Sequence, residues 1–324
     1  MIKNTFVRLP RLLAALAVLS SSPLYLGTAQ AWGTNDTGQV EHFPSAPASP
    51  EQQTGNAVAP NLNPSFGLAD TLGGVMGDLG NQSATHGLQW KSPVLSPTLT
   101  YRSYDDTSIG GFGGNEYSGD LAYDVDLYDG LILGGLYQHT YRGGTNAQGT
   151  SERLDADSGS LYLAKRFFDW INVGLAYQHA ETEHRLTRAV TADLDRSSDG
   201  GSAFVGVSKR KGVWSGSLTT SFSYVHDDYA QQTDLDTGRI SLMGALSADL
   251  VKEFSLGVAF AYHNFIFQDI FPNTSIRDDD YWTVGPRLRF YPTEEITVRL
   301  DFETQEGYKD VKAYTVRLGM DYAF

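Results

Sequence analysis

Two histidines in one short segment are of a residue type that binds metal ions. His179 and His184 bracket the run HAETEH, which also holds Glu181 and Glu183. Successive side chains of a β-strand point to opposite faces, so a separation of five residues puts the two histidines on different sides. The sequence therefore predicts no metal site here and no cofactor elsewhere.

Lipid hydrolysis at a membrane surface is a second chemistry to consider, because it uses a His together with a Ser. His226 stands in HDDY near the end of a predicted strand. The sequence shows no accompanying Ser and Asn or Asp pattern, no serine elbow and no glycine-rich phosphate loop. We predict no catalytic residue and no enzyme. We interpret His139, His226 and His263 as strand-end residues at a membrane interface.

Charged residues form the third candidate set, because they recur on one face of alternating segments. In a soluble fold, inward-facing charges would be desolvated, whereas in a water-filled barrel they reach water or each other. We predict that this face lines a pore. The predicted pore-lining residues are Arg102, Asp120, Asp124, Asp126, Arg166, Arg239, Arg287, Arg289, Arg299, Asp301, Glu303, Arg317 and Asp321. Either a lattice of salt bridges or ion selectivity explains such a set.

The elements that position these charges follow a period of two residues from Val94 to Phe324. In the run 120–127, Leu121, Tyr123, Val125 and Leu127 share one face and the aspartates share the other. The pattern predicts twelve strands, near 94–104, 116–127, 131–142, 158–167, 171–184, 202–210, 213–226, 238–250, 253–267, 280–291, 295–304 and 311–324. Lys165 and Phe204 fit neither face cleanly.

The connections between these strands alternate between short and long. Short ones such as 128–130 and 211–212 alternate with longer ones such as 143–157 and 185–201. Short periplasmic turns and longer external loops are typical of outer-membrane barrels. We therefore predict an all-β fold, a transmembrane antiparallel up-and-down β-barrel of twelve strands over residues 94–324. An ordinary β-sandwich is the alternative.

The apolar face of the strands predicts a lipid-facing exterior with aromatic girdles. The predicted girdle residues are Tyr137, Tyr177, Tyr224, Tyr262 and Tyr314 at one end, and Trp214, Phe254, Tyr322 and Phe324 at the other. Twelve tilted strands give a backbone diameter of roughly 24 Å and a lumen on the order of 10 Å. Such a lumen admits a small solute, an extended peptide or one helix.

The N-terminal residues 1–31 have the composition of a signal peptide. Lys3, Arg8 and Arg11 precede the apolar run 12–19, and 29–31 reads Ala-Gln-Ala. Removing this segment takes away three basic residues and no acidic one, so the net charge moves from -14 to -17. Such an acidic chain gives no support to nucleic-acid binding. The chain holds no cysteine, which excludes disulfides and thiolate sites.

Between the signal peptide and the first strand, the sequence predicts two further segments. Residues 32–62 are rich in Pro, Ser, Gln and Gly, which predicts a disordered periplasmic segment. In 63–93, Asn63-Pro64 is a typical helix start, followed by apolar residues at spacings of three or four. Because many glycines would weaken this helix alone, we predict that it sits in the lumen as a plug. A disordered periplasmic tether is the alternative. The predicted plug residues are Phe66, Asp70, Leu72, Met76 and Asp78.

The C-terminal strand resembles the assembly signal of outer-membrane barrels. Alternate apolar residues run from Tyr314 to Tyr322 and Phe324, and the chain ends on Phe. With the helix before it, the stretch from about 63 to 324 resembles the translocator domain of autotransporters. Those proteins carry a long passenger between the signal peptide and the helix, whereas here only about thirty residues lie between the two.

The resemblance implies a plugged translocation or secretion pore in the outer membrane. A passive diffusion porin for small solutes is the alternative, and an outer-membrane enzyme or adhesin is the third. The expected partners are outer-membrane lipid and lipopolysaccharide, the barrel-assembly machinery, and either a secreted polypeptide or a small solute. The chain would reach the outer membrane after export through the inner membrane.

Overall fold

The structure, a computed structural model, describes residues 93–106, 112–128, 130–168, 170–187, 191–193, 195–229, 234–268, 280–306 and 311–324. The predicted signal peptide (1–31), disordered segment (32–62) and plug helix with its connection (63–93) lie outside the described residues, apart from Pro93. In the described part of the chain, no helix is long and apolar enough to cross a membrane.

The described chain consists of β-strands. Twelve of them build one wall, and the three-residue strand β6 (Thr191–Asp193) pairs with the end of β5 alone. The wall strands are β1 (Val94–Asp106), β2 (Phe112–Tyr128), β3 (Leu131–Asn146), β4 (Ser151–Phe167), β5 (Ile171–Thr187), β7 (Arg196–Lys211), β8 (Trp214–Tyr229), β9 (Leu235–Val251), β10 (Phe254–Gln268), β11 (Asp280–Phe290), β12 (Ile296–Glu306) and β13 (Val311–Ala323).

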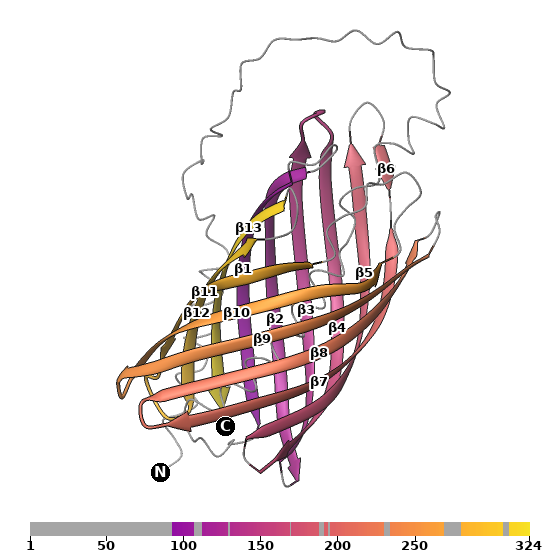
Figure 1. Cartoon of the computed structure of the whole chain (residues 1–324). Coiled ribbons are helices and arrows are strands. Elements are labelled where there is room, and N and C mark those ends of the chain that lie inside the picture. Colours follow the sequence, from indigo (N-terminus) through magenta and orange to yellow (C-terminus); the bar gives the residue numbers. More distant parts are fainter. Residues whose placement is uncertain are drawn as a thin grey trace, which may run out of the picture. The chain divides into compact units, whose positions relative to one another are not determined.

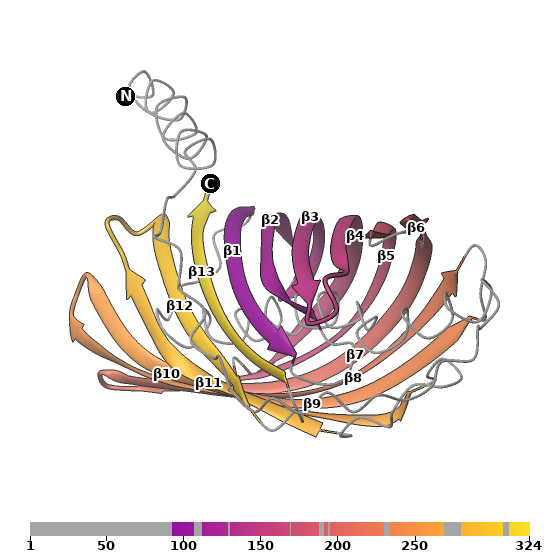
Figure 2. The same ribbon diagram turned by 90° about the horizontal axis from the view of Figure 1, so that it is seen from above.

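The wall closes on itself (Figure 1). Each wall strand pairs antiparallel with the wall strand before it in the chain, so β7 pairs with β5. The wall closes where β1 pairs antiparallel with β13, with Leu95 opposite Tyr322 and Thr98 opposite Gly319. Seen from above, β1 and β13 lie side by side and the wall curves round from them (Figure 2). Closure leaves none of the twelve wall strands with an unpaired edge, which a barrel in lipid requires. The predicted twelve-stranded up-and-down barrel is confirmed.

The hairpins differ from the sequence-based prediction at one end of the barrel. Strands reach further into the segments predicted as long external loops, so β3 and β4 leave only 147–150 between them. There Asn146 accepts hydrogen bonds from the backbone N–H groups of Gln148 and Thr150, closing a tight turn. The interpretation of 143–157 as a long loop was therefore wrong. Ser151, Asp155 and Asp157 are residue types typical of loops, but here they pair in the ladder between β3 and β4.

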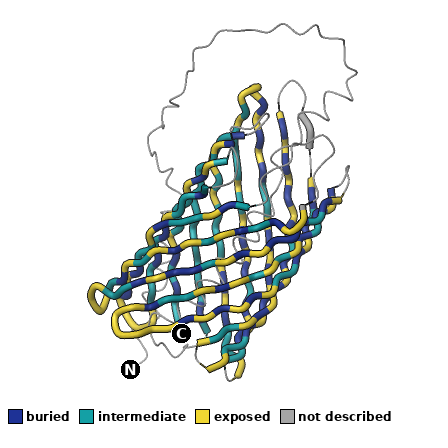
Figure 3. Tube along the Cα trace, viewed as in Figure 1, coloured by how far each residue is buried: buried dark blue, intermediate teal, exposed yellow. Residues whose placement is uncertain are grey.

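Along many of the strands, such as β4 and β5, buried and exposed residues alternate (Figure 3). On β9, Ile240, Leu242 and Leu246 are exposed, whereas Ser241 and Ser247 are buried. Apolar residues thus face outward and polar residues inward, the reverse of a soluble domain and the pattern of a membrane barrel. Strands of 17 residues such as β2 and β4 are longer than the roughly 9–11 residues needed to cross a bilayer, so they extend beyond it.

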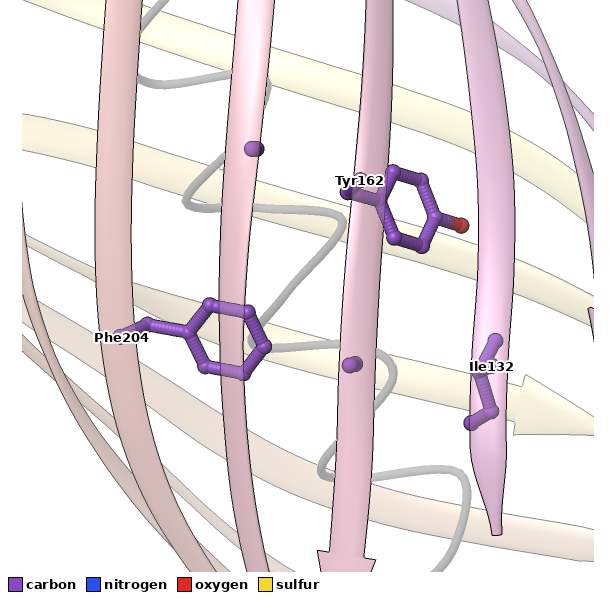
Figure 4. Packing of buried hydrophobic residues seen from close by; sticks show 5 residues of the cluster. Ile132, Tyr162 and Phe204 are labelled. Carbon is purple, nitrogen blue, oxygen red and sulfur yellow. The ribbon is translucent and has the colours of Figure 1, made fainter.

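One apolar cluster faces inward, on the wall formed by β3, β4, β5 and β7. Ile132, Tyr162 and Phe204 belong to it (Figure 4). Two glycines make room for its rings: a Cβ on Gly134 would lie 2.1 Å from the ring of Tyr162, and one on Gly174 would lie 2.2 Å from Phe204. The sequence pattern could not assign Phe204 to a face, because the pattern expects polar residues on the inner face. The structure shows that Phe204 is an aromatic residue on that inner face.

Candidate functional site

The lumen of the barrel holds a cavity of about 170 Å³. Its lining comes from β1, β2 and β3 and from β8 to β13, which closure of the wall brings around one lumen. Polar side chains predominate in the lining, among them six carboxylates and four arginines. Such a lining can hold water and charged solutes, so we take it as the candidate site.

The structure brings nine of the thirteen predicted pore-lining residues together around this cavity. These nine are Arg102, Asp120, Asp124, Arg287, Arg299, Asp301, Glu303, Arg317 and Asp321. The other four are placed on the same inward face but away from this cavity. Arg289 bonds Asp301, Arg239 donates to the hydroxyl of Tyr281, Arg166 donates to Asn172, and Asp126 is half-buried on β2.

Asp301 of β12 is the centre of a nearly buried charge cluster. Its carboxylate accepts two hydrogen bonds from Arg289, at 2.7 and 3.2 Å, and lies 3.3 Å from Nε of Arg287. All three side chains are nearly buried, at 11% exposure or less. A carboxylate shared by two nearly buried guanidinium groups compensates both cations and holds β11 to β12.

Two more ion pairs continue this lattice toward β13 and β1. Arg299 lies 3.1 Å from Asp321 and also donates to the hydroxyl of Thr98, whereas Arg317 lies 2.6 Å from Glu303. Arg102 donates to Gln305 at 2.8 Å. The arginine-rich sector predicted from the sequence therefore forms cross-strand pairs, as the salt-bridge interpretation expected.

A second charged cluster was missed because the sequence assigned three of its residues, Glu152, Arg196 and Asp227, to external loops. Glu152 of β4 accepts from Tyr104, lies 3.4 Å from Arg142 and 3.5 Å from His184. Nearby on the same face, Arg196 lies 3.7 Å from Asp227. Arg142 already lay at the end of a predicted strand, and extending the period of two beyond the predicted strand ends would have placed Glu152 on the same inner face.

The outer face carries a repeated contact between tyrosine and aspartate. Four of the predicted girdle tyrosines donate to an aspartate on the next strand of the wall. The pairs are Tyr137 with Asp157, Tyr177 with Asp199, Tyr224 with Asp236, and Tyr262 with Asp280. Since all four rings are exposed on the apolar face, each combines an apolar body with a polar tip, as residues at a membrane interface do.

The histidines separate as their strand positions dictate. His139, His179 and His226 are exposed on the outer face, each beside one of these aspartates. His184 is 3% exposed on the inner face, so the predicted separation of His179 from His184 is confirmed.

The assignment of His263 to the membrane interface was wrong. It follows the outward-facing Tyr262, and it points inward to bond Ser241 at 2.8 Å. Among the residues that the structure describes, no group of three His, Asp or Glu could hold a metal ion.

Comparison with known proteins identifies the architecture. No protein-family model matches the sequence, and neither does any curated protein. Solved structures do match. The translocator domain of the autotransporter NalP from Neisseria meningitidis has a TM-score of 0.61 at 10% identity, covering 80% of this chain and 97% of that one. The fold is that of an autotransporter translocator domain.

Two further structures support this translocator fold. The β domain of the Bordetella autotransporter BrkA has a TM-score of 0.57 at 11% identity, covering 72% of this chain and 99% of that one. The transport unit of AIDA-I from Escherichia coli has a TM-score of 0.56 at 13% identity, covering 78% and 98%. A closed barrel with an apolar exterior and a polar lumen resides in the bacterial outer membrane, as predicted.

Proposed function

We propose that the chain forms a translocator-type pore in the outer membrane, with residues 63–80 as a helix that occupies the lumen and limits conduction. The observation that carries this proposal is the lumen itself. It is enclosed by a closed wall of twelve strands and lined by charged side chains around a cavity. Water in an open lumen can solvate such inward charged side chains, whereas a filled core would desolvate them.

The plug is proposed from its sequence and from its tether. The helix spacing of 63–80 is followed by about a dozen residues before β1, which begins at Val94 at the end of the wall where the chain also ends. That short connection keeps the segment at one mouth of the barrel. Its carboxylates Asp70 and Asp78 carry the charge opposite to that of the arginines on β11 to β13.

The partners proposed for this pore follow from its two faces. The outer face is apolar and carries the girdle of tyrosines, so it suits contact with outer-membrane lipid and lipopolysaccharide. The terminal strand, ending in Tyr322 and Phe324, fits the barrel-assembly machinery. The lumen would pass a secreted polypeptide or a small solute. We propose no enzymatic role and no cofactor.

Single-channel recording in planar bilayers tests this function. We expect the mature chain to give small, flickering currents, because the helix occupies most of a lumen on the order of 10 Å. Deleting residues 32–90, or 63–80 alone, should raise the unitary conductance several-fold. Asp70→Asn combined with Asp78→Asn should shorten the closed periods without changing the open level.

A passive diffusion porin is the second candidate, favoured by the polar cavity. Unchanged conductance after deleting 63–80, in a barrel shown to be folded, would remove the plug and leave this porin function ahead. A folded barrel that conducts no ions with or without residues 32–90 would contradict both pores and favour an adhesin.

A further inference from the structure

The charges around the cavity are unevenly compensated. On β11, β12 and β13, Arg287, Arg299 and Arg317 each have a carboxylate of a neighbouring strand within 3.3 Å. Strand β2, in contrast, contributes three carboxylates to the cavity and no cation, namely Glu116, Asp120 and Asp124. The excess negative charge of the cavity therefore lies along β2.

Asp124 is the least compensated of these carboxylates. It is 4% exposed and lines the cavity, yet its Oδ1 accepts no hydrogen bond. The charged groups that act on it are Asp321, which repels it, and Arg299, which already lies 3.1 Å from Asp321. A carboxylate buried in this way is costly unless a donor or a cation reaches it.

A second unpartnered oxygen lies beside it. The hydroxyl of Tyr162, a residue that is 2% exposed, has no hydrogen-bond partner. A Cβ built on Gly134 would lie 2.3 Å from this hydroxyl and 2.3 Å from Oδ1 of Asp124. The Tyr162 hydroxyl oxygen and Oδ1 of Asp124 are therefore at most 4.6 Å apart, which is twice 2.3 Å. Figure 4 shows the hydroxyl pointing away from Phe204, toward the strand that carries Ile132.

We propose that Asp124 and Tyr162 form a binding site for an ammonium or guanidinium group, and that the pore selects solutes that carry one. Two N–H donors of one such group reach two oxygens at this separation, and its positive charge compensates Asp124. A bare metal ion fits less well, because the described residues offer no group of three metal-binding side chains. This inference rests on the proposed function as a pore.

The test measures reversal potentials of the full mature chain in planar bilayers, first in a potassium chloride gradient and then with methylguanidinium chloride on one side. We expect wild type to pass cations in preference to chloride, and methylguanidinium in preference to potassium. Asp124→Asn should lower both ratios several-fold. Tyr162→Phe keeps the charge, so it should lower the methylguanidinium preference alone.

Two further variants serve as controls. Asp126→Asn removes a carboxylate from the same face of β2 without touching the cavity lining, and should change the ratios much less. Gly134→Ala alters no charge but displaces both oxygens, and should reproduce the loss of methylguanidinium preference. Faster migration of each unheated variant on gels checks that the barrel has formed.

The outcomes separate this inference from the pore function. A conducting barrel that prefers chloride, or whose ratios are unchanged in Asp124→Asn, overturns the cation site and leaves the pore intact. A folded barrel without any conductance overturns the pore and the cation site together.

Discussion

Asp301→Ala should destabilise the barrel more than any other single charge removal on its wall. The substitution leaves Arg287 and Arg289 buried without the carboxylate that compensates both. Removing one partner of a buried ion pair costs about 3–5 kcal/mol. Folded barrels run faster on gels until heat unfolds them, so the temperature at which the fast band disappears should fall markedly.

The matched control lies two residues further along the same strand. Glu303 pairs with Arg317, whose side chain is 30% exposed and can be solvated when its partner is lost. Glu303→Ala should therefore cost about 1 kcal/mol or less. Equal shifts for the two variants would contradict the claim that burial makes the Asp301 cluster special. Replacing Asp301, Arg287 and Arg289 together by apolar residues should recover much of the stability.

Deleting Phe324 should remove most of the assembled barrel from the outer membrane while leaving export through the inner membrane unchanged. Phe324 donates its backbone N–H to Pro93, where the two ends of the wall meet, and its ring packs against Tyr322 at 4.7 Å. The deletion removes both contacts from the seam where β13 must meet β1. Fractionation and immunoblotting of the processed protein measure the result.

An aromatic replacement of Phe324 is the control for this deletion. Phe324→Tyr retains the ring and the backbone N–H, so it should assemble nearly as wild type does. Normal outer-membrane levels in the deletion variant would argue against a terminal assembly signal. Accumulation of unprocessed precursor would instead point to a defect in export.

The closed barrel could be predicted from the sequence because lipid imposes a simple rule on a strand. Every second residue faces lipid and must be apolar, so a run such as 121–127 indicates both that the segment is a strand and which of its faces meets the lipid. The outer strand ends could not be predicted in the same way. Beyond the bilayer both faces of a strand meet water, the alternation fades, and residues such as Glu152 and Arg196 look like loop residues.

The site was predictable in its members but not in its pairing. Which residues face inward follows from the period of two, and nine of the predicted residues meet at one cavity. Which arginine bonds which carboxylate depends on the register between strands. The excess charge on β2 emerges only after pairs such as Arg299 with Asp321 are known. The role of Gly134 also required the structure, because Tyr162 comes from another strand.

Cysteine labelling of two adjacent residues on β9 tests the central claim, an outer-membrane barrel with a conducting lumen. The chain has no cysteine of its own, so each introduced thiol is unique. Met243 lines the cavity, whereas Leu242 is 36% exposed on the apolar face. In planar bilayers, a charged water-soluble thiol reagent should lower the current through Met243→Cys and leave Leu242→Cys unchanged. Block of Leu242→Cys with no effect on Met243→Cys would contradict this assignment of lumen and lipid faces.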